Sequence, residues 1–288
     1  MKKIFFLSII SLFSVAAYCH NFVQNIWEDV PSMKHHRVIM EVSVPENCNG
    51  SAVIICPGGS YDHLGIITEG RSTAKWFNEK GTATFILWYR VAKNNFHYPA
   101  MMEDIQRTIQ LLRENSFQYG IHKNKIAAIG FSAGGHLVCW SGEFGKRKNE
   151  LEKLGISTDA NLQPDFVIPV YPVVTMKDDI CHKWSRKSLI GKNPDERTVN
   201  DFSLELNVPE QMCPVYLVAC KDDPVVIYEN SVRLAQALEE KNADYVFKSY
   251  DWGGHGFGMM NNSFMKTFHW NEDLYLWLEE RGFFKNDN

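Results

Sequence analysis

The hydrophobic pattern of the chain changes period several times between residues 37 and 282. Apolar runs of strand length, typical of strands buried on both faces, lie at 51–56, 82–89, 125–130, 164–172 and 214–220. Segments in which apolar and polar residues alternate, typical of half-exposed strands, lie at 37–44 and 244–250. Stretches with apolar residues three or four positions apart, typical of amphipathic helices, lie at 98–115, 228–242 and 268–282.

Strands and helices that alternate in this way predict an α/β fold. A connection between two parallel strands must cross over the sheet, so helices cover both of its faces. We therefore expect a mostly parallel central sheet, with the amphipathic strands at the start of the chain forming an antiparallel edge. The longest loop-like stretches are residues 141–164 and 175–212. A chain of 288 residues can bury the core of one large domain of this class.

The first residues have the layout of a secretory signal peptide. Two lysines precede an apolar run over residues 4–13, and small residues follow it. The run is shorter than the ~20 residues of a membrane span, so we expect no stable membrane insertion. We predict a signal peptide at 1–19 and a catalytic domain at 20–288, which implies a secreted or periplasmic protein. Lipid attachment at Cys19 is the alternative, but the bulky Tyr18 before it argues against a lipoprotein.

Composition and charge limit the kinds of molecule that we expect the protein to bind. The chain is 45% hydrophobic and 22% charged, with a net charge of −4 and a pI near 6.2, so neither nucleic acid nor an anionic membrane surface is an expected partner. No His or Cys spacing fits a zinc site, and we expect no metal and no cofactor. Export permits disulfides, and the cysteines in loop-like sequence that could pair are Cys48, Cys181 and Cys213. The cysteines in apolar runs, which we interpret as core residues, are Cys56, Cys139 and Cys220.

One serine stands between two glycines where the strand at 125–130 passes into the expected helix. The sequence from Gly130 to Gly134 has the G-x-S-x-G pattern of a nucleophile elbow, in which a strained turn lifts the serine above the sheet edge. The pattern makes Ser132 the candidate nucleophile. It also places the backbone N–H of Ala133 at a helix N-terminus, where it can face an oxyanion.

A serine nucleophile needs a base and an orienting acid, which in this type of fold follow it in the order acid, then histidine. Asp222 and Asp223 come directly after the strand at 214–220. We prefer Asp223 because its D-x-V-V spacing leaves the loop turning into the next helix. His255 lies in a glycine-rich loop after the strand at 244–250 and is the candidate base. We interpret His136, one turn into the helix after the elbow, as structural.

The loop after the strand at 51–56 can complete the site. Its glycines allow the backbone to curl, so we expect the N–H groups of Gly59 and Ser60 to join that of Ala133 in an oxyanion hole. Aromatic and polar residues of segments 60–70 and 175–212 could line a sugar-sized cleft: Tyr61, His63, Trp184 and Arg186. Among them, Tyr61 is the candidate substrate-binding residue.

These motifs together give the chain a family resemblance. It resembles the α/β-hydrolases of the esterase/lipase group that includes acetyl xylan esterases and BD-FAE-type carboxylesterases, from about residue 27 to residue 284. The segments that carry the resemblance are ICPGGSY, YRVAKNNFHYPAMMEDIQRTIQLLREN, IGFSAGGHL, PDFVIPVYPVVTM, SLIGKNP, DDPVV and GGHGFG. Ser60 stands where relatives often have a third glycine, and Pro57 stands where lipases with an HGGG motif have histidine.

The resemblance implies a triad of Ser132, Asp223 and His255, oxyanion donors at Gly59 and Ser60, and short acyl groups on sugars as substrates. We therefore expect a serine carboxylesterase similar to acetyl xylan esterases, whose partner is a small-molecule or oligosaccharide ester. The alternatives are a serine exopeptidase or a lipase of the same fold. Neither the natural ester nor the oligomeric state follows from the sequence.

Overall fold

One sheet of eight strands organises residues 20–285, the part of the chain that the computed structural model describes; the predicted signal peptide at 1–19 lies outside the described residues. The strands are β1 (His20–Asn25), β2 (Ile39–Val44), β3 (Ala52–Cys56), β4 (Ala83–Leu87), β5 (Ile126–Phe131), β6 (Phe166–Val170), β7 (Val215–Cys220) and β8 (Tyr245–Tyr250). Their order across the sheet is β1-β2-β4-β3-β5-β6-β7-β8. The pairs β1–β2 and β2–β4 are antiparallel and the other pairs are parallel, which confirms the expected sheet with its N-terminal antiparallel edge.

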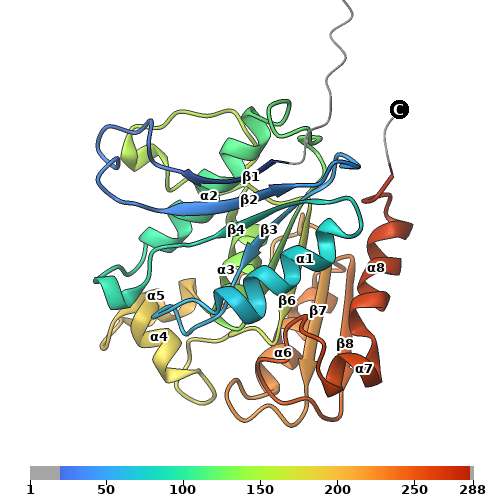
Figure 1. Ribbon diagram of the computed structural model, residues 1–288. Helices are drawn as coiled ribbons and strands as arrows, with labels where there is room; N and C mark the ends of the chain where they lie inside the picture. The colour runs from blue at the N-terminus through green and yellow to red at the C-terminus, as the bar shows by residue number, and fades with distance from the viewer. Residues whose placement is uncertain (1–19, 286–288) are drawn as a thin grey trace, which may run out of the picture.

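Helices cover both faces of this sheet. They are α1 (Ser72–Asn78), α2 (Ala100–Glu114), α3 (Ala133–Phe144), α4 (Lys183–Ile190), α5 (Glu196–Asp201), α6 (Glu229–Glu240), α7 (Ser263–Phe268) and α8 (Trp270–Glu280). Alternate residues of β3 separate two cores: Ile54 packs with α2, α3 and α6, whereas Val53 and Ile55 pack with α1 and α8. In Figure 1, α1 accordingly lies in front of the sheet and α3 behind it.

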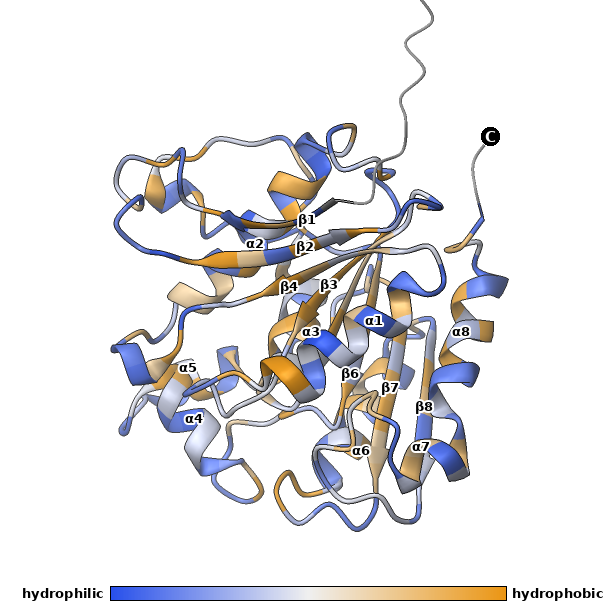
Figure 2. Ribbon diagram, viewed as in Figure 1, coloured by the Kyte–Doolittle hydropathy of each residue, from blue (hydrophilic) through white to orange (hydrophobic). Residues whose placement is uncertain are grey.

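Burial decreases towards the β8 edge of the sheet. Every residue of β7 is buried, while the residues of β8 are only partly covered or exposed. Figure 2 shows the same change as hydrophobic colour along β7 and more hydrophilic colour along β8. The continuous and the alternating sequence patterns thus distinguish these two strands correctly.

The expectation of a loop over 175–212 is wrong, because this stretch contains α4 and α5. Each helix is short and buries few apolar side chains, so neither gives a clear helical period. Side-chain caps stabilise their first turns instead: His182 accepts the N–H of Ser185, and Asp195 accepts the N–H of Thr198 at 2.7 Å. Likewise α3 extends to residue 144, inside the stretch 141–164 expected to be loop.

All six cysteines between residues 20 and 285 are unpaired, so the possible pairing of Cys48, Cys181 and Cys213 is not observed. Cys213 is buried rather than in an exposed loop, and Cys56, Cys139 and Cys220 are core residues as expected. Within the same residues, no helix has the length and apolar character needed to cross a membrane.

Candidate active site

Ser132 occupies a strained turn between β5 and α3. Its φ of 54° and ψ of −117° lie in a region that residues other than glycine rarely adopt. The two flanking glycines make the turn possible: a Cβ at Gly130 would lie 2.0 Å from the carbonyl oxygen of Gly134, and a Cβ at Gly134 would lie 2.0 Å from that of Cys56. The serine between two glycines is therefore a consequence of close backbone packing at the sheet edge.

The loop after β3 lies directly against this turn. A Cβ at Gly58 would lie 3.0 Å from the Cβ of Ser132. Gly59 has a φ of 132° and accepts the N–H groups of Asp62 and His63, which closes a tight turn. The N–H groups of Gly59 and Ser60 donate to no group within residues 20–285. Ala133 is the first residue of α3, where a backbone N–H has no acceptor within its helix.

Tyr61 requires a correction, because its side chain cannot contact a substrate. It is completely buried, and its hydroxyl donates to Nδ1 of His136 at 2.8 Å. The carbonyl of Phe202 lies 2.9 Å from Nε2 of His136, so Nε2 carries the proton and Nδ1 is the acceptor. Burial lowers the pKa of His136 to about 4, so the ring is neutral at neutral pH. The interpretation of His136 as structural fits this placement.

Asp223, and not Asp222, contacts His255. Oδ2 of Asp223 lies 2.7 Å from Nδ1 of His255, while Oδ1 accepts the N–H groups of Val225 and Val226 at 2.8 and 2.9 Å. Asp222 instead accepts the N–H of Gly254 at 2.8 Å and so holds the loop that carries the histidine. The Asp223 side chain is buried, which limits competition from water for its contact with the imidazole.

Tyr171 brings the His255 loop next to the serine turn. It follows Val170 of β6, whose carbonyl accepts the N–H of Ser132 at 2.9 Å. The rings of Tyr171 and His255 lie 4.6 Å apart and are tilted by 53°. Ser132, Asp223 and His255 therefore follow the ends of β5, β7 and β8, and Gly59 and Ser60 follow the end of β3. Asp223 contacts His255 directly, and Tyr171 connects the ring of His255 with the strand that binds the backbone of Ser132. The side chains can act as nucleophile, orienting acid and base.

Sequence reasoning missed a buried carboxylate at this place, Glu69. Its Oε2 accepts the N–H of Gly58 at 2.6 Å, and its Oε1 accepts the hydroxyl of Tyr171 at 2.8 Å. Burial raises the pKa of this carboxyl group. No sequence signal distinguishes Glu69 from an ordinary glutamate on a helix surface. One of its partners is the backbone N–H of Gly58, and the other, Tyr171, lies far along the chain.

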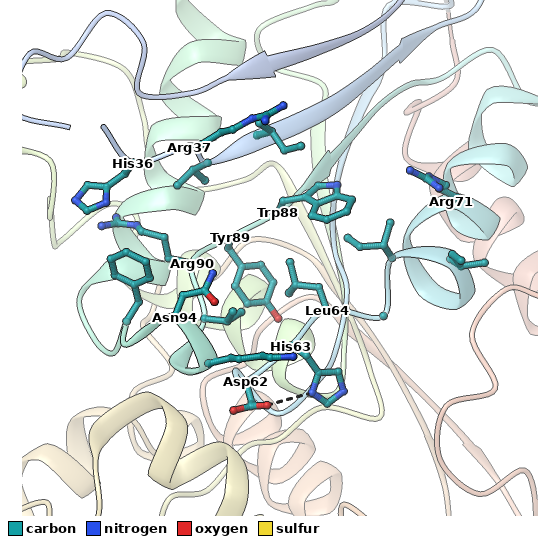
Figure 3. Close-up of a pocket in the computed structure, with 18 of the residues that line it drawn as sticks. His36, Arg37, Asp62, His63, Leu64, Arg71, Trp88, Tyr89, Arg90 and Asn94 are labelled. Atoms are coloured by element: carbon teal, nitrogen blue, oxygen red, sulfur yellow. Dashed lines mark ion pairs between the residues drawn. The ribbon is translucent and has the colours of Figure 1, made fainter. Parts of the chain in front are cut away.

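A cavity of about 1140 Å³ lies beside the same loop. Its walls are residues 62–68, residues 35–39 before and at the start of β2, and residues at the end of β4 and after it, such as Trp88. In Figure 3, Asp62 and His63 close its lower end, and Arg37 and Trp88 lie at the upper end. Within residues 20–285, no group of three His, Cys, Asp or Glu side chains could hold a metal ion.

Tyr89 connects the cavity with the loop after β3. Its side chain lines the cavity, and its hydroxyl donates to the carbonyl of Pro57 at 2.6 Å. At the end of the cavity formed by Asp62 and His63, the ring of His63 lies 5.7 Å from that of Trp184 on α4. The cavity therefore begins two residues beyond the expected oxyanion donor Ser60 and extends away from the serine along the β4 side of the sheet.

Comparison with protein families identifies two overlapping matches. The model of the BD-FAE family matches residues 40–238, which include the serine turn and Asp223. The model of the dienelactone hydrolase family matches residues 200–285, which include Asp223 and His255.

Curated relatives include an acetylxylan esterase of Xylanibacter ruminicola, 27% identical over 219 residues, which are 75% of this chain and 42% of that protein. Another is endo-1,4-beta-xylanase B of Butyrivibrio fibrisolvens, 32% identical over 216 residues, or 74% of this chain and 33% of that protein. The chain thus spans less than half the length of these two proteins.

Solved structures match over nearly their whole length. The acetyl ester-xyloside bifunctional hydrolase of Caldicellulosiruptor lactoaceticus has a TM-score of 0.78 and 28% identity, covering 91% of this chain and 97% of that one. A thermophilic esterase of Thermogutta terrifontis has a TM-score of 0.74 and 20% identity, covering 91% and 93%. These matches show that the fold is that of the α/β-hydrolases.

Proposed function

Because the chain belongs to the BD-FAE family, we propose that it is a secreted or periplasmic serine carboxylesterase that removes short acyl groups, above all acetyl, from sugars. The observation that carries the proposal is the 2.7 Å contact between Asp223 and His255 beside the strained turn of Ser132. An orienting acid, a base and a serine held above a sheet edge are the parts that acyl transfer requires.

In the proposed mechanism the three side chains have different roles. His255 takes the proton of Ser132 as the hydroxyl oxygen attacks the ester carbonyl carbon, and Asp223 keeps Nδ1 of the imidazole protonated so that Nε2 is the base. The N–H groups of Gly59, Ser60 and Ala133 stabilise the oxyanion, and the loss of one such donor typically costs ~10²–10³ in rate. His255 then protonates the leaving alcohol, and water attacks the acyl-enzyme to release the acid.

The sugar part of the substrate is proposed from the cavity and from the relatives. A cavity of about 1140 Å³ is slightly larger than the ~300–1,000 Å³ typical of small-ligand pockets and so has room for a sugar unit. Its aromatic walls and its exposed polar rim of Lys93 and Asn94 suit a carbohydrate, which offers apolar faces and many hydroxyl groups. The similar proteins of Xylanibacter and Caldicellulosiruptor, an acetylxylan esterase and an acetyl ester-xyloside hydrolase, support the same substrate class.

Replacement of the nucleophile tests the reaction. Ser132→Ala should abolish acetate release from acetylated xylo-oligosaccharides and labelling by a fluorophosphonate probe, because no other group can form the acyl-enzyme. Ser141→Ala is the matched control: this serine lies in α3, and its hydroxyl only donates to the Val138 carbonyl at 2.7 Å. Ester hydrolysis that survives in Ser132→Ala at the wild-type rate would contradict the proposed mechanism.

The acyl preference is measured as kcat/KM over acetyl, butyryl, octanoyl and feruloyl esters of one alcohol. We expect a maximum at acetyl and a steep fall beyond about four carbons, because each methylene in a fitted pocket is worth ~1–3 kcal/mol. A maximum at octanoyl would indicate a lipase, and a maximum at feruloyl a phenolic-acid esterase. Aminoacyl anilides as preferred substrates would indicate an exopeptidase.

A further inference from the structure

Glu69 lies between the two halves of the candidate active site. One half is the loop after β3, which carries the expected oxyanion donors, and the other is the loop after β8, which carries His255. The carboxylate contacts the first half through Gly58, whose N–H points at Oε2 at 2.6 Å. It reaches the second through Tyr171, whose hydroxyl lies 2.8 Å from Oε1.

Tyr171 extends this contact to the histidine loop in two ways. Its hydroxyl oxygen accepts the N–H of Gly258 at 3.2 Å, three residues beyond His255. Its ring lies 4.6 Å from the imidazole of His255. A single carboxylate thus connects the backbone next to the oxyanion donors with the ring that packs against the base.

The local backbone gives Glu69 this position. Residues 66–71 form one turn of π-helix, a wider turn that is found frequently at functional sites. The N–H of Glu69 donates to the carbonyl of Gly65, and the N–H of Gly65 donates to the carbonyl of Gly58. Gly58 is therefore held on both sides, by its carbonyl and by its N–H.

Glu69 is buried among histidine and tyrosine side chains. Besides Gly58 and Tyr171, the groups near its carboxylate include His63, Tyr89 and His255. Glu69 forms no ion pair with a lysine or arginine within residues 20–285. A buried carboxylate without a permanent cation is costly, whereas a glutamine would supply a neutral acceptor of the same size.

We propose that Glu69 is a positioning residue of the esterase: its carboxylate fixes the oxyanion loop through Gly58 and the wall behind His255 through Tyr171. This role rests on the proposed function. Both carboxylate oxygens accept hydrogen bonds from donors, as expected of the ionised form.

Two variants at Glu69 test the two contacts of its carboxylate. Glu69→Gln keeps the size of the side chain but replaces one acceptor oxygen by an amide NH2 group, so kcat for p-nitrophenyl acetate should fall by up to about 10²-fold, the cost of misplacing catalytic groups by about 1 Å. KM should change little, because Glu69 contacts Gly58 and Tyr171 and not the substrate. Glu69→Asp keeps both acceptor oxygens but cannot reach both partners, so kcat should fall here too.

Tyr171→Phe and Glu150→Gln complete the comparison. The phenylalanine keeps the ring against His255 and loses the bridge to Gly258, so we expect a fall in kcat with little change in KM. Glu150 is the matched control, since it is also a buried carboxylate that accepts a tyrosine hydroxyl, that of Tyr98 at 2.7 Å, but its other contacts are Lys148 and Lys153. Its glutamine variant should lower thermal stability and leave kcat unchanged.

The outcomes distinguish this role from the proposed function. Fluorophosphonate labelling of Ser132 supplies a second readout that does not depend on the choice of ester. A wild-type protein without hydrolysis or labelling would overturn the proposed function itself. An active wild type together with a folded Glu69→Gln variant of unchanged kcat would overturn only the role of Glu69. An equal fall of kcat in Glu150→Gln would also overturn it, because the loss would then follow from the removal of any buried carboxylate.

Discussion

The two neighbouring aspartates after β7 have different partners although they share one turn. Asp223 contacts the imidazole of His255, whereas Asp222 accepts backbone N–H groups of Gly253 and Gly254. One carboxylate therefore orients the base, and the other shapes the loop that carries it. Substitution of Asp223 should therefore reduce ester hydrolysis much more than substitution of Asp222.

Asp223→Asn should reduce kcat by up to about 10⁴-fold, the loss known for the orienting carboxylate of another serine-hydrolase triad. The amide would present an N–H to Nδ1 or leave it without a charged partner, so the imidazole loses its orientation. Asp222→Asn should cost less than about tenfold, because an amide oxygen still accepts an N–H and a single hydrogen bond is worth ~1 kcal/mol. Steady-state hydrolysis of p-nitrophenyl acetate measures both, and equal losses would transfer the orienting role to Asp222 or divide it.

The sequence predicts a triad of Ser132, Asp223 and His255 because each residue follows a recognisable strand in a characteristic motif, and the structure places Asp223 against His255. The sequence does not predict the placement of Tyr61 or Glu69. The Tyr61 hydroxyl finds its acceptor in His136, 75 positions later, and the Glu69 carboxylate finds a donor in the hydroxyl of Tyr171, 102 positions later. Whether a polar side chain points inward depends on such remote partners, which no local pattern contains.

Among the elements, the strands at the centre of the sheet were the most predictable. They are buried on both faces, so continuous apolar runs identify them. β1 was not assigned a range, because it exposes 43% of Phe22 and 57% of Val23 and has no buried face to indicate it. The short helix α1 buries only Thr73, Ala74 and Phe77, too few positions to define a helical period.

Position 134, where α3 packs against the end of β3, should not accept any side chain. In Gly134→Ala the new Cβ would meet the backbone of Cys56, so β3 or the serine turn must shift, at a cost of about 1–3 kcal/mol in stability. The shift would also displace the expected oxyanion donors, and kcat should fall. Gly191→Ala is the control: its φ of 86° is unfavourable for alanine, but nothing lies within 4 Å of the added Cβ.

Thermal unfolding and ester hydrolysis of the two glycine variants provide the measurement. We expect both variants to lose stability, Gly134→Ala through the clash with Cys56 and Gly191→Ala because alanine at positive φ costs about 1–2 kcal/mol. Only Gly134→Ala should lose kcat. An active Gly134→Ala variant would show that the end of β3 can move without disturbing the reaction.

For the molecule as a whole, the buried His136 links stability to pH. Its folded-state pKa of about 4 lies below the ordinary value of 6.5. The unfolded chain therefore binds a proton that the folded protein does not, and the free energy of unfolding falls as pH decreases between these two values. The contribution is fully present above pH 6.5, and about 3 kcal/mol of it is lost by pH 4.

Chemical unfolding at several pH values between 4 and 7 tests this dependence. His136→Gln keeps polar atoms for Tyr61 and Phe202 but cannot take up a proton, so its stability should change less over this interval than that of the wild type. Identical pH dependence in both proteins would mean that other groups cause the acid sensitivity. The circular dichroism of both proteins at pH 7 controls for a change of fold.

The position of His255 after β8 also has a consequence for the order in which the protein becomes active. β8 is the last strand that the structure describes, and it pairs only with β7, at the edge of the sheet. During synthesis Ser132 leaves the ribosome more than a hundred residues before His255, so a growing chain carries the proposed nucleophile without its proposed base. Under the proposed mechanism the serine gains reactivity only when β8 docks on β7, so an unfinished or partly opened chain would not hydrolyse esters in the wrong place.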